Sequence, residues 1–144
     1  MVRILATPRS QHGNPYCRLL YDEMERQGCV VDEYRVERLL AGDYDIWHLH
    51  WPEGFFQDYA AAQAAGRIVT FVVLLVWAWC SGTRVVWTLH NLEAHENRHP
   101  VLEDVFWRVF PRLVHATISL SEQATCLAVE KMPALRQKPS VVIP

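Results

Sequence analysis

The stretch Val85-Val86-Trp87-Thr88-Leu89-His90-Asn91-Leu92-Glu93-Ala94-His95-Glu96 changes its chemistry near the middle. The first residues are apolar and rich in β-branched side chains, as in a buried strand. Ionisable side chains follow at once, so we expect the strand to end near His90. In open α/β sheets, ligands bind in the crevice beyond the carboxyl ends of the strands. The stretch therefore predicts a functional site that contains His90, Asn91, Glu93, His95 and Glu96.

Strands and helices alternate on both sides of this stretch. Apolar runs predict strands over residues 2–7, 29–36, 45–50, 84–90, 116–120 and 140–143. Helical patterns cover residues 15–27, 53–65, 68–80 and 101–110, where Pro111 should kink or end the helix, and a last helix follows Ser121. This alternation is typical of β-α-β units. We expect one domain over residues 1–144 with an α/β fold: a Rossmann-like three-layer sandwich with a mostly parallel sheet of about six strands and helices on both faces.

The loop before the first predicted helix is a second candidate binding surface. His12-Gly13-Asn14 leads into Pro15, which suits the first position of a helix. Free backbone N–H groups and the positive end of the helix dipole would suit an anion or a sugar hydroxyl here. A plain helix cap by Asn14 explains the same pattern equally well. Helical spacing predicts a buried face made of Tyr16, Leu19, Leu20, Met24 and Gln27.

Histidines gather in the loops that follow the predicted strands. Five of the seven lie after the first, third and fourth strands, namely His12, His50, His90, His95 and His99. An imidazole with a pKa of about 6.5 can give or take a proton near neutral pH. The cluster therefore indicates a binding or catalytic edge of the sheet.

The same histidines raise the question of a zinc site. His48 and His50 share one face of a predicted strand, and His90 and His95 could add further ligands. The Trp51-Pro52 that follows, the lack of an aspartate at the other strand ends and the distant cysteines argue against zinc, and we expect no metal. His48, which lies inside the strand, is better explained as a hydrogen-bonded core residue.

An almost wholly apolar segment covers residues 68–80. It is shorter than the roughly 20 residues that a membrane span needs, so we expect it not to cross a bilayer. Its composition fits a helix buried against the sheet. The alternative is that Trp77 and Trp79, at its end, dock on a lipid surface.

Charge and cysteine content limit the partners and the compartment. The net charge of -2 and the pI near 6.4 argue against nucleic acid as a partner. The four cysteines show no Cys-x-x-Cys spacing, and the first residues read as a strand rather than a signal peptide. We therefore expect reduced thiols in a cytoplasmic protein, which could be peripheral on the inner face of the membrane.

Four blocks of the chain resemble the N-terminal domain of glycosyltransferases with the B-type fold, in which two Rossmann-like domains face each other across a cleft. The blocks are His12–Tyr21, Asp45–Glu53, Val85–Glu96 and Ile118–Glu122. The last residues, Val141–Pro144, resemble the start of the crossover into the second domain. The blocks are similar in particular to bacterial exopolysaccharide mannosyl- and glucuronosyltransferases, which extend lipid-linked sugars.

The resemblance implies an acceptor-side domain, with the C-terminal nucleotide-sugar domain absent from this chain, so the chain alone should turn over no sugar nucleotide. Its substrates would be a nucleotide sugar and a saccharide or lipid-linked acceptor, with no cofactor. His90 matches a strand-end histidine that reaches the transferred sugar. The resemblance gives acceptor-side or cleft-facing positions to His12, Gly13, Asn14, His50, Trp51, Glu53, Ser121 and Glu122.

The sequence leaves the catalytic base open. Inversion at the anomeric carbon needs a general base near the acceptor hydroxyl. Glu53, His90, Glu93 and Glu96 are candidates, and closeness to the strand end favours His90 or Glu93. With retention no such base is needed, and His90 would position the sugar. A metal-dependent hydrolase built on the histidines and a non-catalytic sugar-binding domain are the alternative functions.

Overall fold

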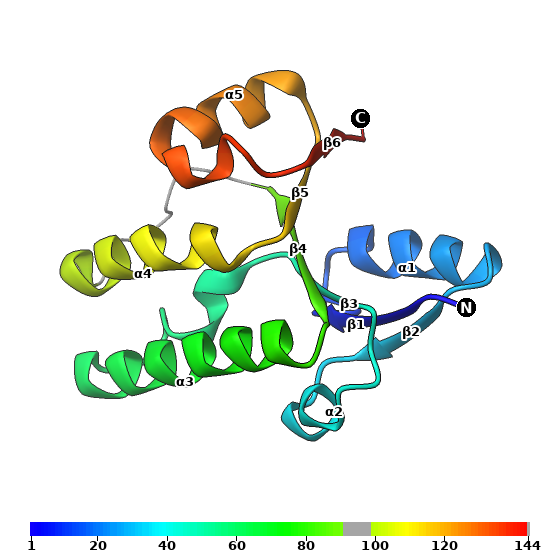
Figure 1. Cartoon of the computed structure of the whole chain (residues 1–144), viewed down its shortest axis with the longest axis horizontal. Helices are drawn as coiled ribbons and strands as arrows, with labels where there is room; N and C mark the ends of the chain where they lie inside the picture. Colours follow the sequence, from blue (N-terminus) through cyan, green and yellow to red (C-terminus); the bar gives the residue numbers. More distant parts are fainter. Residues whose placement is uncertain (91–98, 144) are drawn as a thin grey trace.

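The computed structural model describes residues 1–90 and 99–143, which contain one six-stranded sheet. The strands are β1 (Arg3–Thr7), β2 (Val30–Glu33), β3 (Ile46–Leu49), β4 (Arg84–Leu89), β5 (Ala116–Ser119) and β6 (Ser140–Val142). Their order is β2-β1-β3-β4-β5-β6, and every neighbouring pair is parallel (Figure 1). The predicted Rossmann-like α/β fold is confirmed.

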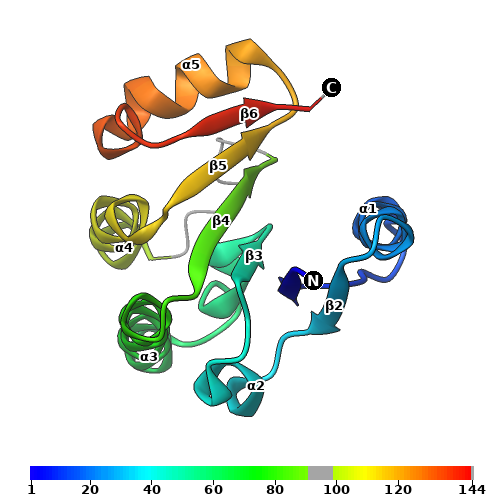
Figure 2. The ribbon, with the colours of Figure 1, turned by 45° about the vertical axis from the view of Figure 1, so that its right-hand side comes forward.

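Helices cover both faces of this sheet, as expected (Figure 2). They are α1 (Tyr16–Arg26), α2 (Val36–Ala41), α3 (Ala61–Cys80), α4 (Pro100–Leu113) and α5 (Glu122–Lys131), with 3-10 turns η1 (Pro52–Phe55) and η2 (Pro133–Leu135). α1 packs on one face, and the other helices pack on the opposite face. On the α1 face, the half formed by β4, β5 and β6 has no helix over it in the described part of the chain. Val141 on that half is 57% exposed.

Aromatic side chains fill the core between the sheet and α3. Trp47 of β3 stacks on Tyr34 with ring centroids 5.3 Å apart and meets Phe71 of α3 edge-on at 5.6 Å. Successive side chains of a strand point to opposite faces of the sheet. Because Trp47 and Leu49 point into this core, His48 and His50 point toward α1.

The predicted helix over residues 53–65 is wrong in its first part. Residues 52–55 form the short turn η1, and α3 begins only at Ala61, so residues 61–65 alone are helical as expected. Two phenylalanines that follow Gly54 turn into the core: Phe56 is fully buried, and Phe55 stacks on Phe71 at 4.2 Å. A continuous helix would carry one of these neighbouring rings away from the core, because consecutive helical positions lie about 100° apart.

α3 is one helix of 20 residues, and this length changes the reading of the apolar segment. By length and composition alone it is long enough to cross a membrane, so the argument that the segment is too short is wrong. Only a third of its apolar window is buried. Trp77 and Trp79 are 44% and 46% exposed, so the expectation of a helix buried against the sheet holds for its inner face alone.

Two details of the other helices also differ from expectation. The buried positions of α1 are Cys17 and Tyr21, whereas Leu19, predicted to face inward, is 58% exposed. A pattern of apolar side chains gave Leu19 the inward position, but hydrogen bonds of the Tyr21 hydroxyl place the phenol there instead. Pro111 lies inside α4 and does not end it, because the helix continues to Leu113.

Candidate functional site

A chain of four hydrogen bonds connects β3, β4 and α1 beneath the carboxyl edge of the sheet. Thr88 Oγ1 lies 2.7 Å from His48 Nε2, and His48 Nδ1 lies 3.0 Å from the Tyr21 hydroxyl. The same hydroxyl lies 2.7 Å from His50 Nε2, and His50 Nδ1 lies 2.8 Å from His90 Nε2. All members but His90 are buried, so the chain leads from the core to the site.

His90 stands at the outer end of this chain between two aromatic side chains. The Trp51 indole stacks on its ring with centroids 4.4 Å apart and an interplanar angle of 18°. The Tyr16 ring meets it edge-on at 5.0 Å. Ring contacts and the bond to His50 hold the imidazole in one orientation, and Trp51 is itself partly exposed. An exposed aromatic face beside a fixed polar group suits a sugar ring, which has apolar faces and a polar rim.

Burial keeps the three histidines of the chain neutral. Burial, together with the neighbouring histidines, lowers the pKa of His48 to about 4 and that of His50 to about 2. Burial also lowers the pKa of His90 and raises that of Tyr21. The hydrogen-bonded side chains from Thr88 to His90 therefore carry no charge at neutral pH, and His90 is a weaker base than a free imidazole.

The carboxyl groups of Glu53 in η1 and Glu103 of α4 interact electrostatically with each other. Burial raises the pKa of Glu53, a backbone hydrogen bond partly offsets this rise, and the charge of Glu103 adds to it. Glu103 is buried, and its Oε1 has no hydrogen-bond partner in the described residues. A carboxylate whose pKa moves toward neutrality is a better general base than an exposed one. Among the described carboxylates proposed as the base, Glu53 is the one whose pKa shifts in this direction.

The remaining predicted site residues divide into three groups. Asn14 Oδ1 accepts the Tyr16 N–H at 3.0 Å just before α1, a bond of the kind that the capping explanation expects, while His12 and Gly13 are exposed. Ser121 Oγ accepts the Ala124 N–H at 3.1 Å as the cap of α5, and Glu122 follows it in an exposed position. In the described part of the chain, no hydrogen bond or ring contact joins either group to His90. Asn91, Glu93, His95 and Glu96 lie outside the described residues.

Sequence reasoning missed four members of this region: Tyr16, Tyr21, Thr88 and Glu103. Thr88 could have been found, because it lies two residues before His90 and so shares its face of β4. The two tyrosines gave a weaker signal, since only their polar atoms distinguish them from ordinary core residues. The prediction that His48 is a hydrogen-bonded core residue is confirmed.

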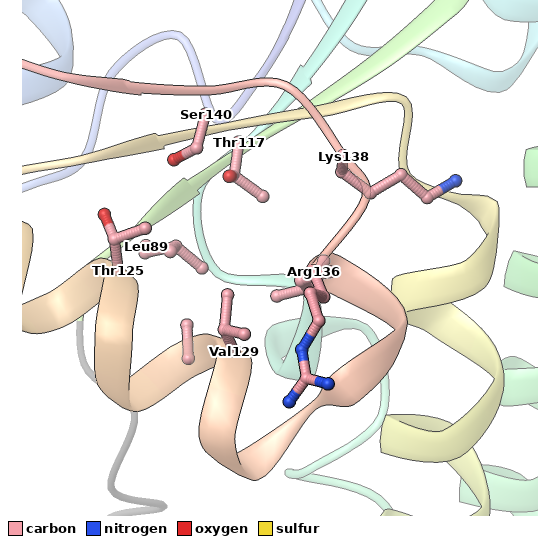
Figure 3. Close-up of a pocket in the computed structure, with 9 residues that line it drawn as sticks. Leu89, Thr117, Thr125, Val129, Arg136, Lys138 and Ser140 are labelled. Carbon is pink, nitrogen blue, oxygen red and sulfur yellow. The ribbon is translucent and has the colours of Figure 1, made fainter.

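A separate cavity of about 110 Å³ lies under α5 (Figure 3). Leu89, Thr117, Thr125 and Ser140 line it, and Arg136 and Lys138 lie at its side. Leu89 and Thr117 point away from α1, so this cavity is on the opposite face from the histidines. Ligand pockets for organic molecules occupy roughly 300–1,000 Å³, so this one is too small for a sugar nucleotide.

Comparisons with known proteins show a similarity to a mannosyltransferase. No protein-family model matches the chain. Over 85 residues it is 34% identical to the GDP-mannose:glycolipid 4-beta-D-mannosyltransferase of Xanthomonas campestris pv. campestris, and a second sequence of that name from this organism gives the same values. The match covers 59% of this chain but only 24% of the relative, so the part of the chain that matches spans about a quarter of that enzyme. The similarity supports a relationship to glycosyltransferases.

Proposed function

We propose that this chain is the acceptor-side domain of a glycosyltransferase of the B-type fold, which transfers a hexose from a nucleotide sugar to a lipid-linked saccharide during exopolysaccharide synthesis in the cytoplasm. The observation that carries the proposal is the similarity to a glycolipid mannosyltransferase. The Rossmann-like sheet, with the partly exposed His90 and Trp51 at its carboxyl edge, supports it.

In the proposed reaction, an acceptor hydroxyl oxygen bonds to the anomeric carbon while the bond from that carbon to the diphosphate oxygen breaks. The electron pair of the broken bond leaves with the nucleoside diphosphate, and the hydroxyl proton passes to a base. Trp51 would hold an apolar sugar face, and His90 would hold a polar group of the transferred sugar. If the reaction inverts configuration, Glu53 is the proposed base, because its raised pKa suits proton acceptance.

A transfer assay on the complete gene product tests this proposal. The protein is incubated with radiolabelled GDP-mannose, or a panel of other nucleotide sugars, and a polyprenyl-diphosphate-linked saccharide. We expect label to move into the lipid extract only when the acceptor is present. Release of free sugar at the same rate without acceptor would indicate a hydrolase instead. No transfer from any donor in the panel would contradict the proposed function.

We further propose that the outer face of α3 brings the enzyme to its lipid-linked acceptor. The exposed apolar residues that form this surface are Ala62, Gly66, Val69, Val73, Val76, Trp77, Trp79 and Cys80. The helix has no acidic residue, and a cation lies beside an aromatic ring near each end. The Arg67 guanidinium lies 4.0 Å from the Tyr59 ring centroid, and the Lys138 ammonium lies 5.8 Å from that of Trp79. Apolar stripes flanked by aromatic and basic groups suit anionic lipid surfaces.

Vesicle co-sedimentation checks this surface. The vesicles contain phosphatidylethanolamine and phosphatidylglycerol. We expect the vesicle affinity of Trp77→Ser/Trp79→Ser to be lower than that of wild type by at least about tenfold, because two interfacial indoles are lost. Trp79 Nε1 also donates to the Leu113 carbonyl at 2.7 Å, so Val69→Ser/Val73→Ser serves as a second variant that keeps this bond. Leu19→Ser, on the opposite face of the sheet, is the matched control. Equal sedimentation of all four folded proteins would contradict the proposal.

A further inference from the structure

The chain of hydrogen bonds that ends at His90 has a direction, and this direction determines which nitrogen of His90 carries the proton. A neutral imidazole has one N–H donor and one acceptor nitrogen. Both ring nitrogens of His48 and of His50 are engaged in the chain, so each ring must accept at one nitrogen and donate at the other. The direction of the hydrogen bond at one end of the chain therefore determines which nitrogen is protonated at the other end.

One direction satisfies every buried proton. If the Thr88 hydroxyl donates to His48 Nε2, His48 Nδ1–H donates to the oxygen of Tyr21. The Tyr21 hydroxyl then donates to His50 Nε2, and His50 Nδ1–H donates to His90 Nε2. His90 Nε2 is then an acceptor, and the remaining proton of the neutral ring lies on Nδ1.

The other arrangements leave a buried hydroxyl proton unpaired. In the reverse direction, His48 Nε2–H donates to Thr88, whose own proton then has no acceptor in residues 1–90 and 99–143, although Thr88 is fully buried. If His48 and His50 both donate to the Tyr21 oxygen, the phenol proton likewise has no acceptor among the described residues. An unsatisfied buried donor disfavours an arrangement by a factor of roughly five to 150. The direction from Thr88 to His90 therefore dominates.

We propose that Thr88, His48, Tyr21 and His50 are positioning residues that fix His90 as the tautomer protonated on Nδ1. His90 then presents an N–H donor at the carboxyl edge of the sheet instead of a basic lone pair. The tautomer follows from the hydrogen bonds alone. That the N–H donates to an oxygen of the transferred sugar or of the leaving diphosphate rests on the proposed function. In that role His90 stabilises the transferred group, and the acceptor proton goes to a different side chain.

Long-range ¹H–¹⁵N correlation spectra of protein labelled with ¹⁵N-histidine test the proposal, because cross-peak patterns distinguish the two tautomers. The spectra are recorded at pH 7.5, where the hydrogen-bonded histidines are neutral. The ring signals that disappear in the His90→Asn variant are assigned to His90. For wild type we expect Nδ1 of His90 to be protonated in more than about 80% of molecules. Protonation of Nε2 instead would overturn the proposal.

Variants then test whether the hydrogen bonds from Thr88 to His50 fix the tautomer of His90. Thr88→Val keeps the side-chain shape but removes the donor, so neither direction is favoured and the His90 signals should move to values between the two tautomers. Tyr21→Phe should have the same effect by interrupting the chain. Thr117→Val, a buried threonine of β5 on the opposite face, is the matched control and should change nothing. An unchanged Nδ1–H tautomer in both folded variants would show that the chain does not fix it. Since no substrate is present, failure here is distinct from failure of the transfer assay.

Discussion

Replacing His90 with alanine in the complete enzyme is expected to lower kcat for sugar transfer by about 10²–10⁴-fold. The structure fixes this imidazole through the bond to His50 and the stacked ring of Trp51, so its polar atom is already placed when the substrate arrives. A preorganised group of this kind stabilises the transition state without reorganisation, and that advantage is lost with the side chain. Steady-state rates with saturating donor and acceptor measure the effect.

A control variant makes the His90→Ala result specific. Leu19→Ala shortens an exposed side chain of α1 that is outside the hydrogen-bonded chain, and kcat should stay within a factor of about three. Circular dichroism should show that both variants are folded. A decrease below about tenfold in His90→Ala would reduce His90 to a structural residue.

Stability should fall as the pH falls through the range in which free histidine titrates. We expect the free energy of unfolding to decrease by about 2–4 kcal/mol between pH 7 and pH 5. His48 and His50 have folded-state pKa values of about 4 and about 2, below the value of about 6.5 in the unfolded chain. In this window the unfolded state binds protons that the folded state does not, so acid favours unfolding. His90 and His115, whose pKa values burial also lowers, act in the same direction.

Urea denaturation at several pH values between 5 and 7.5 measures this dependence. The full contribution of the neutral histidines should be present above pH 7, and the steepest loss should come below pH 6.5. His12→Gln, which changes an exposed histidine, should show the same pH profile as wild type. A free energy of unfolding that is constant from pH 7.5 to pH 5 would mean that the buried histidines are charged, or are solvated in the folded state.

The parts of the fold that follow from local pattern were predictable. All six strands were expected close to their observed positions, because buried parallel strands are short apolar runs bounded by turn residues. The residue at which α3 begins was not, since it depends on where Phe55 and Phe56 pack. α2 was also missed, because six residues give too few turns for a helical period to be seen.

The candidate site was predictable in place but not in composition. Strand ends placed His50 and His90 at one edge of the sheet, and the structure joins them by a hydrogen bond. Tyr21 could not be assigned, because which side of α1 faces the sheet is decided by packing and hydrogen bonds between segments far apart in the chain. The importance of Glu103 likewise depends on a neighbour, Glu53, that lies 50 positions earlier.

The order of the strands also bears on how the chain assembles as it leaves the ribosome. After β3 has paired with β1, each later strand pairs with the one made just before it, so the sheet extends in the direction of synthesis. Pairing of sequence neighbours keeps loop-closure costs low. All members of the histidine chain lie within the first 90 residues, on α1, β3 and β4 or directly after those strands. The polar interior of the site can therefore form before β5 and β6 are translated, and these strands add to an edge that is already in place.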